Sequence, residues 1–219
     1  MNGGIFVKIF VDSELMGQSA YFGWQDKDEA LYGLREGYKN SADDLVEIAV
    51  NSGNNVKVLD TYIFPILFSY RHCLEISLKH IYMRACGKIP VGGHNLLTLW
   101  DIIKVEIIDK MINSEQFIEQ VKQYKEHFIE YNLNGVECNK IRSMLKELQE
   151  SNQRGAEMEP AKKQVDQKAE VWRYLMSADE NLFFTQGHSI DYLILKDGID
   201  YIYEVLDYIY HIVDEYLSS

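Results

Sequence analysis

Few residues in this sequence break helices or form cross-links. Only three prolines occur among 219 residues, a composition that favours long helices. The three cysteines, Cys73, Cys86 and Cys138, are odd in number and lack C-x-x-C spacing. We therefore expect reduced thiols in a cytoplasmic protein. Because no histidines, cysteines or acidic residues have the spacing of metal ligands either, we predict neither a metal site nor a cofactor.

Long apolar runs and an excess of positive charge are also missing. No apolar run reaches membrane-spanning length without a charge, and the opening MNGGIFVKIFVDSEL lacks the regions of a signal peptide. Lys and Arg number 22 against 34 Asp and Glu, so the formal net charge is −12. A broad basic surface is therefore unexpected, and we predict neither duplex DNA nor a membrane as partner. A small local basic pocket is compatible with this charge.

What the chain does contain is enough apolar residue for one domain with a substantial core. Hydrophobic residues make up 47% of the sequence, and 15 residues are tyrosine. We expect a single domain over 1–219, with an N-terminal arm at 1–26 and an exposed, polar loop or insertion at 151–170. Alternating apolar residues at 5–11 indicate a short strand or, equally, an apolar arm over the core. The aromatic stretch 172–184 is typical of a short strand or hairpin.

Apolar residues at steps of three and four predict a mostly helical fold. The predicted helices cover 27–51, 60–85, 94–112, 113–131, the residues from a break at Asn134-Gly135 to about 150, and 189–217. The fold class is therefore all-α, an up-and-down bundle with a long final helix and a minor β element.

The final helix carries more apolar surface than one neighbour needs. One apolar stripe along this helix contains Leu195, Ile199, Ile202, Leu206, Ile209, Val213 and Tyr216. A second stripe beside it contains Tyr201, Val205, Tyr208 and Ile212. We therefore predict packing on two neighbours, one of them a second copy in a homodimer.

The 60–85 helix is apolar on nearly every side, which is typical of a core helix, yet charged residues are spread through it. These polar residues are Arg71, His72, Glu75, Lys79 and His80. Glu75 precedes Lys79 by four, the favourable order for a helical ion pair, and Arg71 lies one turn earlier. Two interpretations stay open, an exposed ladder of weak pairs and a buried network whose charges must be paired.

Histidines and one arginine supply the other candidate functional groups. His72 and His80 are eight apart, so structural histidines are favoured over metal ligands. His94-Asn95 follows Gly92-Gly93 at a predicted helix start, where it caps the helix or, alternatively, binds an anion. Arg173 lies between Trp172 and Tyr174 with Asp179 nearby; it either stacks on aromatic rings to hold a loop or contacts phosphate or RNA.

Two stretches resemble the HEPN-like family, the small helical domains of prokaryotic toxin–antitoxin and defence systems. They are PILFSYRHCLEISLKHIYMRACG followed by GHNLLTLW, and WRYLMSADE before the final helix. The resemblance implies a bundle of four or five helices, often dimeric. It also implies one of three activities: metal-independent ribonuclease, nucleotide binder, or partner of a nucleotidyltransferase.

The chain departs from the ribonuclease members, which carry an arginine, four to six residues, and then a histidine. Here Arg71 precedes His80 by nine positions, Arg84 precedes His94 by ten and Arg173 precedes His188 by fifteen. We therefore expect a non-catalytic or divergent binding module for RNA, a nucleotide or a cognate protein, in a defence, stress or toxin–antitoxin setting. The residues expected to bind the ligand or form a buried polar network are Glu75, Lys79, His94, Asn95, Arg173, Tyr174 and Asp179.

Two rival functions remain. An active ribonuclease would need a histidine for proton transfer and an arginine for the developing charge. The candidates are His72, His80 and His94 for the proton, and Arg71 and Arg173 for the charge. A purely structural interaction protein would instead use Glu75, Lys79 and Arg173 to fix the register of its helices.

Overall fold

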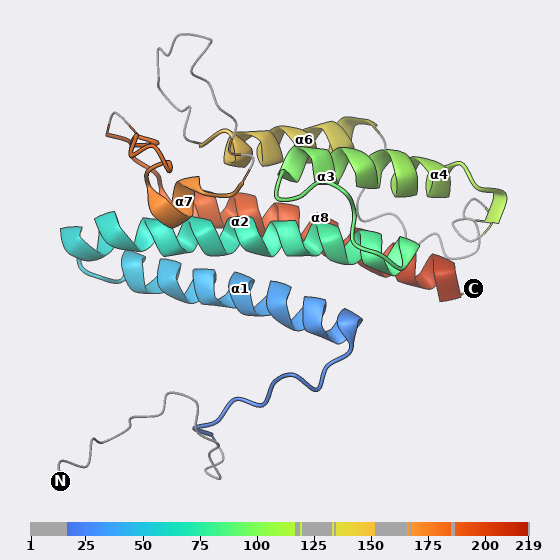
Figure 1. Ribbon diagram of the computed structural model, residues 1–219, viewed down its shortest axis with the longest axis horizontal. Helices are drawn as coiled ribbons and strands as arrows, with labels where there is room; N and C mark the ends of the chain where they lie inside the picture. Colours follow the sequence, from blue (N-terminus) through green and yellow to red (C-terminus); the bar gives the residue numbers. More distant parts are fainter. Residues whose placement is uncertain are drawn as a thin grey trace.

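The computed structural model describes residues 17–116, 119, 133, 135–151, 166, 168–184 and 187–218. Every regular element in these ranges is a helix, so the expected all-α class is confirmed for the described part of the chain (Figure 1). The elements are α1 (Lys27–Val50), α2 (Val56–Cys86), α3 (Leu96–Ile103), the π-helical turn η1 (Lys104–Ile108), α4 (Asp109–Ile112), α6 (Gly135–Gln149), α7 (Val171–Tyr174) and α8 (Tyr192–Ser218).

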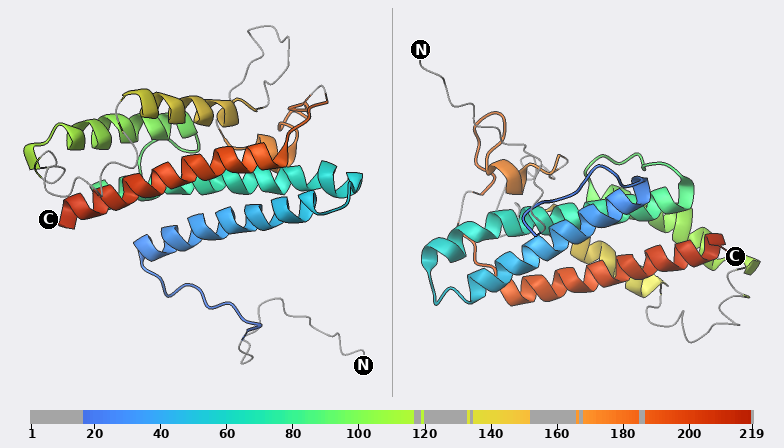
Figure 2. Two further views of the ribbon diagram at one scale, coloured as in Figure 1. Left: turned by 180° about the vertical axis from the view of Figure 1, so that it is seen from behind. Right: turned by 90° about the horizontal axis from the view of Figure 1, so that it is seen from below.

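Helix α2 is the centre of the bundle. It packs against α1 on one side and α3 on the other, with α8 behind it and α7 near its N-terminal end (Figures 1 and 2). Helix α6 lies beside α3 and also reaches α8. Neighbours cover most of the middle of α2, where Arg71 and Glu75 are buried, whereas the charged residues nearer its ends, Lys57, Asp60 and Arg84, are exposed or partly exposed.

The local sequence explains where the first two helices begin. Asp26 and Glu29 form the predicted capping box: the Glu29 N–H donates to Asp26 Oδ1 over 2.9 Å, and the Asp26 N–H donates to Glu29 Oε2 over 3.2 Å. Helix α2 begins at Val56, four residues before the expected start at 60. This extra turn is held to α8, where the Tyr192 hydroxyl donates to the Leu59 carbonyl.

Two segments differ from their predicted secondary structure. The 94–112 helix is one helical run, but its middle widens into the π turn η1. In the 172–184 segment, α7 ends at Leu175 in a left-handed conformation, and a single antiparallel bridge joins Met176 to Leu182. The described residues thus contain no strand. The predicted strand at 5–11, most of the 113–131 helix and most of the 151–170 segment lie outside the described residues.

The first apolar stripe predicted for α8 is confirmed, since its central residues are buried. Val205 and Ile212, from the second stripe, are also buried, and they pack inside this chain. Much of the apolar face that suggested a second copy is therefore used within the bundle, and the homodimer stays a prediction that light scattering would test. No helix in the described ranges is long and apolar enough to cross a membrane.

Candidate functional site

A buried carboxylate organises the polar residues of α2. The Glu75 side chain is 2% exposed, and three cationic or imidazole groups surround it. Its Oε1 lies 2.7 Å from Lys79 Nζ and 2.9 Å from His94 Nδ1, and its Oε2 lies 3.4 Å from Arg71 Nη1. The sequence therefore correctly indicated that the charges of this helix would be paired. With Gln149 we call these residues the Glu75 cluster.

Arg71 and Gln149 join three elements at the base of the Glu75 cluster. Arg71 Nη2 donates to the His94 carbonyl over 2.7 Å and to Gln149 Oε1 over 3.3 Å. Gln149 Oε1 also accepts the Leu96 N–H at 2.9 Å, at the start of α3. Both side chains are buried. Their bonds fix the turn before α3 and the end of α6 relative to α2.

Burial and pairing act in opposite directions on the charges of the Glu75 cluster. Burial alone would raise the pKa of Glu75, but hydrogen bonds and attraction from Lys79 and His94 hold that pKa below its usual value. Burial lowers the pKa of Arg71, and attraction from Asp166 and Glu75 opposes that effect. Glu75 is therefore an ionised carboxylate at neutral pH, able to hold its partners in fixed positions.

The outer edge of the Glu75 cluster is open to solvent. The His94 side chain is half-exposed, and Lys79 is partly exposed. Asn95 caps α3 by accepting the Thr98 N–H at 2.9 Å, which is the structural role expected for it. A Cβ on Gly92 would lie 2.9 Å from Leu99, so the turn needs glycine there for packing.

A row of rings continues along α2 from the Glu75 cluster. Phe68 and His72 are stacked with their centroids 5.6 Å apart, and Tyr38 of α1 meets the His72 ring edge-on at 4.6 Å. Partial burial lowers the pKa of His72. The Arg173 guanidinium lies 5.8 Å from the Phe68 centroid, and 5.2 Å from that of Tyr174. This is the aromatic stacking predicted for Arg173.

Residues 68, 72, 75 and 79 lie on one side of α2, and at 1.5 Å per residue they span about 16 Å. This side of α2 is therefore a partly exposed strip over the buried Glu75, with Arg173 at one end, Lys79 and His94 at the other, and stacked rings between them. We call it the α2 strip. Asp179 is not part of it: this exposed residue lies in the loop after α7, where its carbonyl accepts a bond from Asn181.

His80 lies apart from the α2 strip. It is fully buried, its Nε2 is 2.9 Å from Asp28 Oδ1 of α1, and its ring lies 4.3 Å from that of Tyr210 of α8. Burial lowers the pKa of His80 in spite of Asp28. His80 is therefore a buried histidine between three helices, and it is too enclosed to transfer protons to a ligand on the strip.

The structure contains a second buried polar cluster, which the sequence analysis missed. Arg35 of α1 is 1% exposed, and its Nη2 lies 2.5 Å from Asp207 Oδ1 of α8. Lys39 Nζ lies 2.6 Å from Asp43 and 2.5 Å from Asp200. We call these five residues the α1–α8 seam. The rings around Arg35 are those of Tyr32, Tyr203 and Tyr210, at 5.2, 5.7 and 5.1 Å.

A signal for the seam was present in the sequence. Arg35 and Lys39 continue, in steps of four and three, the buried stripe of Ala42, Val46 and Ala49. Two cations on the core side of an amphipathic helix require acidic partners from another helix, because unpaired buried charges are costly.

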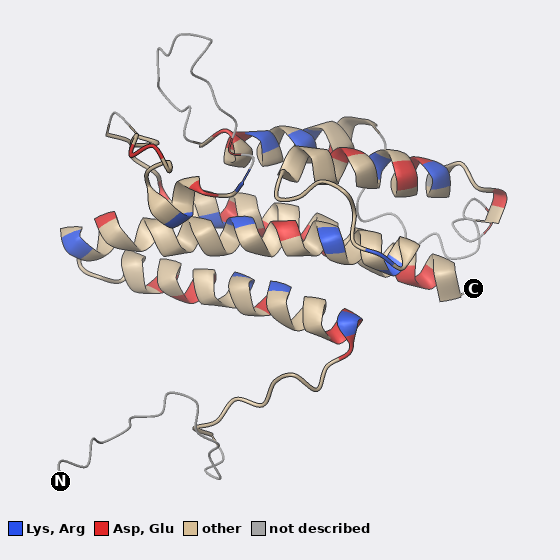
Figure 3. Ribbon diagram, in the orientation of Figure 1, with Lys and Arg blue, Asp and Glu red and all other residues tan. Residues whose placement is uncertain are grey.

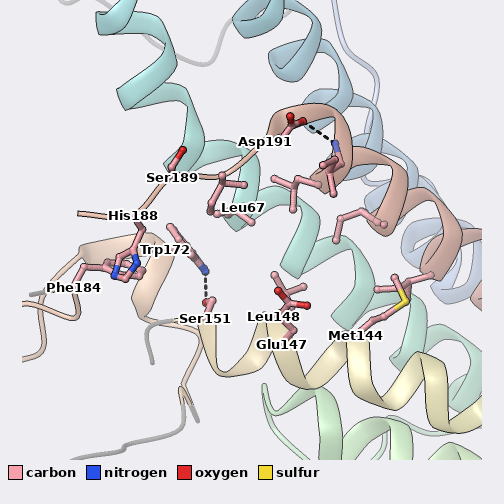
Figure 4. Close-up of a pocket in the computed structure, with 16 residues that line it drawn as sticks. Leu67, Met144, Glu147, Leu148, Ser151, Trp172, Phe184, His188, Ser189 and Asp191 are labelled. Carbon is pink, nitrogen blue, oxygen red and sulfur yellow. Dashed lines mark hydrogen bonds between the residues drawn. The ribbon is translucent and has the colours of Figure 1, made fainter. Parts of the chain in front are cut away.

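The described part of the chain has no group of three histidine, cysteine or acidic residues that could hold a metal ion. Basic and acidic residues are interspersed along the helices (Figure 3). Two adjoining cavities, of about 390 and 670 Å³, lie beside α7 and the start of α8, and Figure 4 shows the first of them. No residue of the Glu75 cluster is among their lining residues.

Comparison with protein-family models, with curated proteins and with solved structures gives no match for this chain.

Proposed function

We propose that the chain is a HEPN-like binding module that receives single-stranded RNA or a nucleotide along the α2 strip, in a prokaryotic defence, stress or toxin–antitoxin setting. The observation that supports this function is the buried Glu75 carboxylate, which holds Lys79 and His94 at the surface beside a row of stacked rings. Proteins that bind single strands combine cations for the backbone with rings on which bases stack.

Each part of the strip has a role in this proposal. Lys79 and Arg173 supply positive charge for phosphate oxygens at the two ends, and His94 adds a half-exposed ring edge beside Lys79. Phe68 and His72 supply a stacking surface between them. The net charge of −12 opposes general attraction of nucleic acid, so binding depends on this local arrangement and weakens with salt.

Fluorescence anisotropy with a labelled single-stranded RNA oligonucleotide at low salt tests the proposal. We expect Lys79→Gln and Arg173→Gln each to weaken binding about tenfold, since one charge-assisted hydrogen bond contributes on the order of 1.5 kcal/mol. Lys110→Gln is the matched control, because Lys110 is exposed on α4. A parent protein that does not bind, or an equal loss in the control, would refute the proposal.

A metal-independent ribonuclease is the second candidate, and the bond between Glu75 and His94 favours it. With Nδ1 of His94 bonded to a carboxylate, Nε2 is the nitrogen that can exchange a proton with a ligand. Cleavage of RNA in the presence of a chelator, abolished in His94→Gln, would support this function. Binding without cleavage would leave the non-catalytic module as the better description.

The third candidate, a purely structural interaction protein, is favoured by the enclosure of Arg71, Glu75 and Gln149. Under this alternative the cluster only fixes the positions of α2, α3 and α6. Neither binding nor cleavage of RNA would then occur. Co-purification with the product of a neighbouring gene would point to a cognate protein partner.

A further inference from the structure

Two adjoining cavities, independent of the α2 strip, share an aromatic wall. Trp172 and Phe184 line both cavities, and their ring centroids are 4.9 Å apart. The first cavity, of about 390 Å³, lies among α2, α6 and α8; the second, of about 670 Å³, lies between the start of α2 and the segment before α8. Figure 4 shows Trp172, Phe184 and His188 gathered on one side of the first cavity.

The wall is fixed in orientation. The indole Nε1 of Trp172 donates to Ser151 Oγ over 2.9 Å, as the dashed line in Figure 4 marks. The polar edge of the ring is held by Ser151, just beyond the end of α6, so the indole keeps a fixed position where it lines both cavities and can contact apolar or cationic groups in them.

Each cavity has its own carboxylate. Glu147 of α6 lines the first cavity and Asp60 of α2 lines the second. Asp191 also lines the first, but its Oδ1 accepts the N–H groups of Leu193 and Ile194 at the start of α8. Among the described lining residues of both cavities there is no lysine or arginine. The pair of cavities is therefore apolar in its walls and carries three carboxylates: Glu147 and Asp60 line different cavities, and Asp191 is held at the start of α8.

We propose that the two cavities together bind one linear aliphatic diamine or polyamine. One ammonium group pairs with Glu147 in the first cavity and a second pairs with Asp60 in the other. The methylene chain between them passes along Trp172 and Phe184, where burial of CH₂ groups and cation–π attraction both favour it.

Other ligand classes fit this arrangement less well. An anion would meet three carboxylates and no described lysine or arginine. A compact divalent cation needs several oxygen ligands converging on one point, whereas Glu147 and Asp60 line different cavities. A neutral apolar molecule would gain nothing from the carboxylates of Glu147 and Asp60.

Isothermal titration calorimetry with a series of α,ω-diamines, from 1,4-diaminobutane to 1,10-diaminodecane, tests this proposal. We expect affinity to pass through a maximum at one chain length and to fall at least tenfold for the monoamine of that length. Glu147→Gln and Asp60→Asn should each reduce the affinity for the best diamine to that of the monoamine. Because both side chains belong to exposed residues, circular dichroism should show that the variants fold like the parent.

Matched controls separate this site from general attraction of cations to an acidic protein. Glu47→Gln and Asp44→Asn change exposed acidic residues of α1, outside both cavities, and should leave binding unchanged. Three results would each overturn the proposal: no binding of any diamine, an affinity that does not depend on chain length, or an equal loss in the α1 controls.

Discussion

The Glu75 cluster and the α1–α8 seam each bury an arginine, but they satisfy it in different ways. Arg71 contacts the His94 carbonyl, Gln149 and two carboxylates, those of Glu75 and of Asp166, which lies 3.9 Å from its Nε; that Nε is the one side-chain nitrogen of Arg71 without a hydrogen bond among the described residues. Arg35 has one carboxylate partner, Asp207; its Nε and Nη1 are buried without a hydrogen-bond partner, and three tyrosine rings surround it. The cost of losing one partner should therefore be greater in the seam, where no second acceptor holds the charge.

The largest expected effect follows from this difference. Asp207→Ala should lower the free energy of unfolding by about 3–5 kcal/mol, because it leaves the buried Arg35 guanidinium without a counter-charge. Urea melts of the variant and the parent measure the loss. Asp197→Ala, an exposed acidic residue on the same helix, is the control and should change stability by less than about 0.5 kcal/mol. Equal melts for the two variants would mean that the tyrosine rings alone stabilise Arg35.

A smaller loss is expected in the Glu75 cluster. Glu75→Ala should cost about 2–4 kcal/mol, since Arg71 loses one carboxylate but keeps Asp166, the His94 carbonyl and Gln149. Lys79→Ala should cost less than about 1 kcal/mol, because Lys79 is partly exposed and Glu75 keeps two partners. Urea melts of both variants check this asymmetry. Equal costs would show that Lys79 is the main partner of Glu75.

The double variant Glu75→Leu with Lys79→Leu sharpens that test. Apolar residues can replace a buried ion pair almost neutrally, so the double variant should unfold at higher urea than Glu75→Ala. If it also loses RNA binding while it folds well, the pair serves the ligand as well as the fold.

The two clusters also differ in how far the sequence predicts them. Arg71, Glu75 and Lys79 follow a spacing of four within one helix, so their pairing can be predicted without knowledge of the fold. Local rules likewise predict the caps at Asp26 and Asn95. Gln149 contacts Arg71 although the two residues are 78 positions apart in the sequence, and Asp207 contacts Arg35 across 172 positions. These contacts depend on how α6 and α8 dock, which helical periodicity does not specify.

Two of the candidate residues lie away from the α2 strip for the same reason. His80 shares α2 with Glu75 but faces α1 and α8, because the helix rotates its side chain to another side. Asp179 is close to Arg173 in sequence, yet the left-handed turn at Leu175 carries the chain into a separate loop. A spacing of three or four residues was therefore a reliable guide within one helix, whereas proximity along the chain alone was not.

Acid should destabilise the protein in two separate pH windows. Burial lowers the folded-state pKa of His72 and His80, so the unfolded chain binds more protons, and stability falls as pH drops below about 6.5. The lowered pKa values of Glu75 and Asp28 act later: their contribution is lost only as pH falls below about 4.5.

Melting temperatures between pH 7 and pH 5 test the histidine window. His80→Gln keeps a donor for Asp28 but does not titrate, so its melting temperature should fall less over this range than that of the parent. His188→Gln, a change at an exposed histidine, should show the parent's dependence. Parallel curves for His80→Gln and the parent would show that His80 accepts its proton equally well in both states.

The smallest effect is expected from the ion pair with the best geometry. Arg142 binds Asp101 through two bonds, Nε to Oδ1 at 2.7 Å and Nη2 to Oδ2 at 2.9 Å, whereas Arg35 reaches Asp207 through one nitrogen. The Arg142 and Asp101 side chains are 43% and 47% exposed, however, so water replaces the lost contacts when either is removed. A double-mutant cycle with Arg142→Ala and Asp101→Ala should therefore give a coupling free energy below about 1 kcal/mol.

The same cycle at Arg35 and Asp207 should give a coupling free energy several times larger, because there the guanidinium is buried. Similar couplings at the two sites would mean that hydrogen-bond geometry, and not burial, sets the strength of the ion pairs in this bundle, and the contrast between the seam and the Glu75 cluster would lose its physical basis.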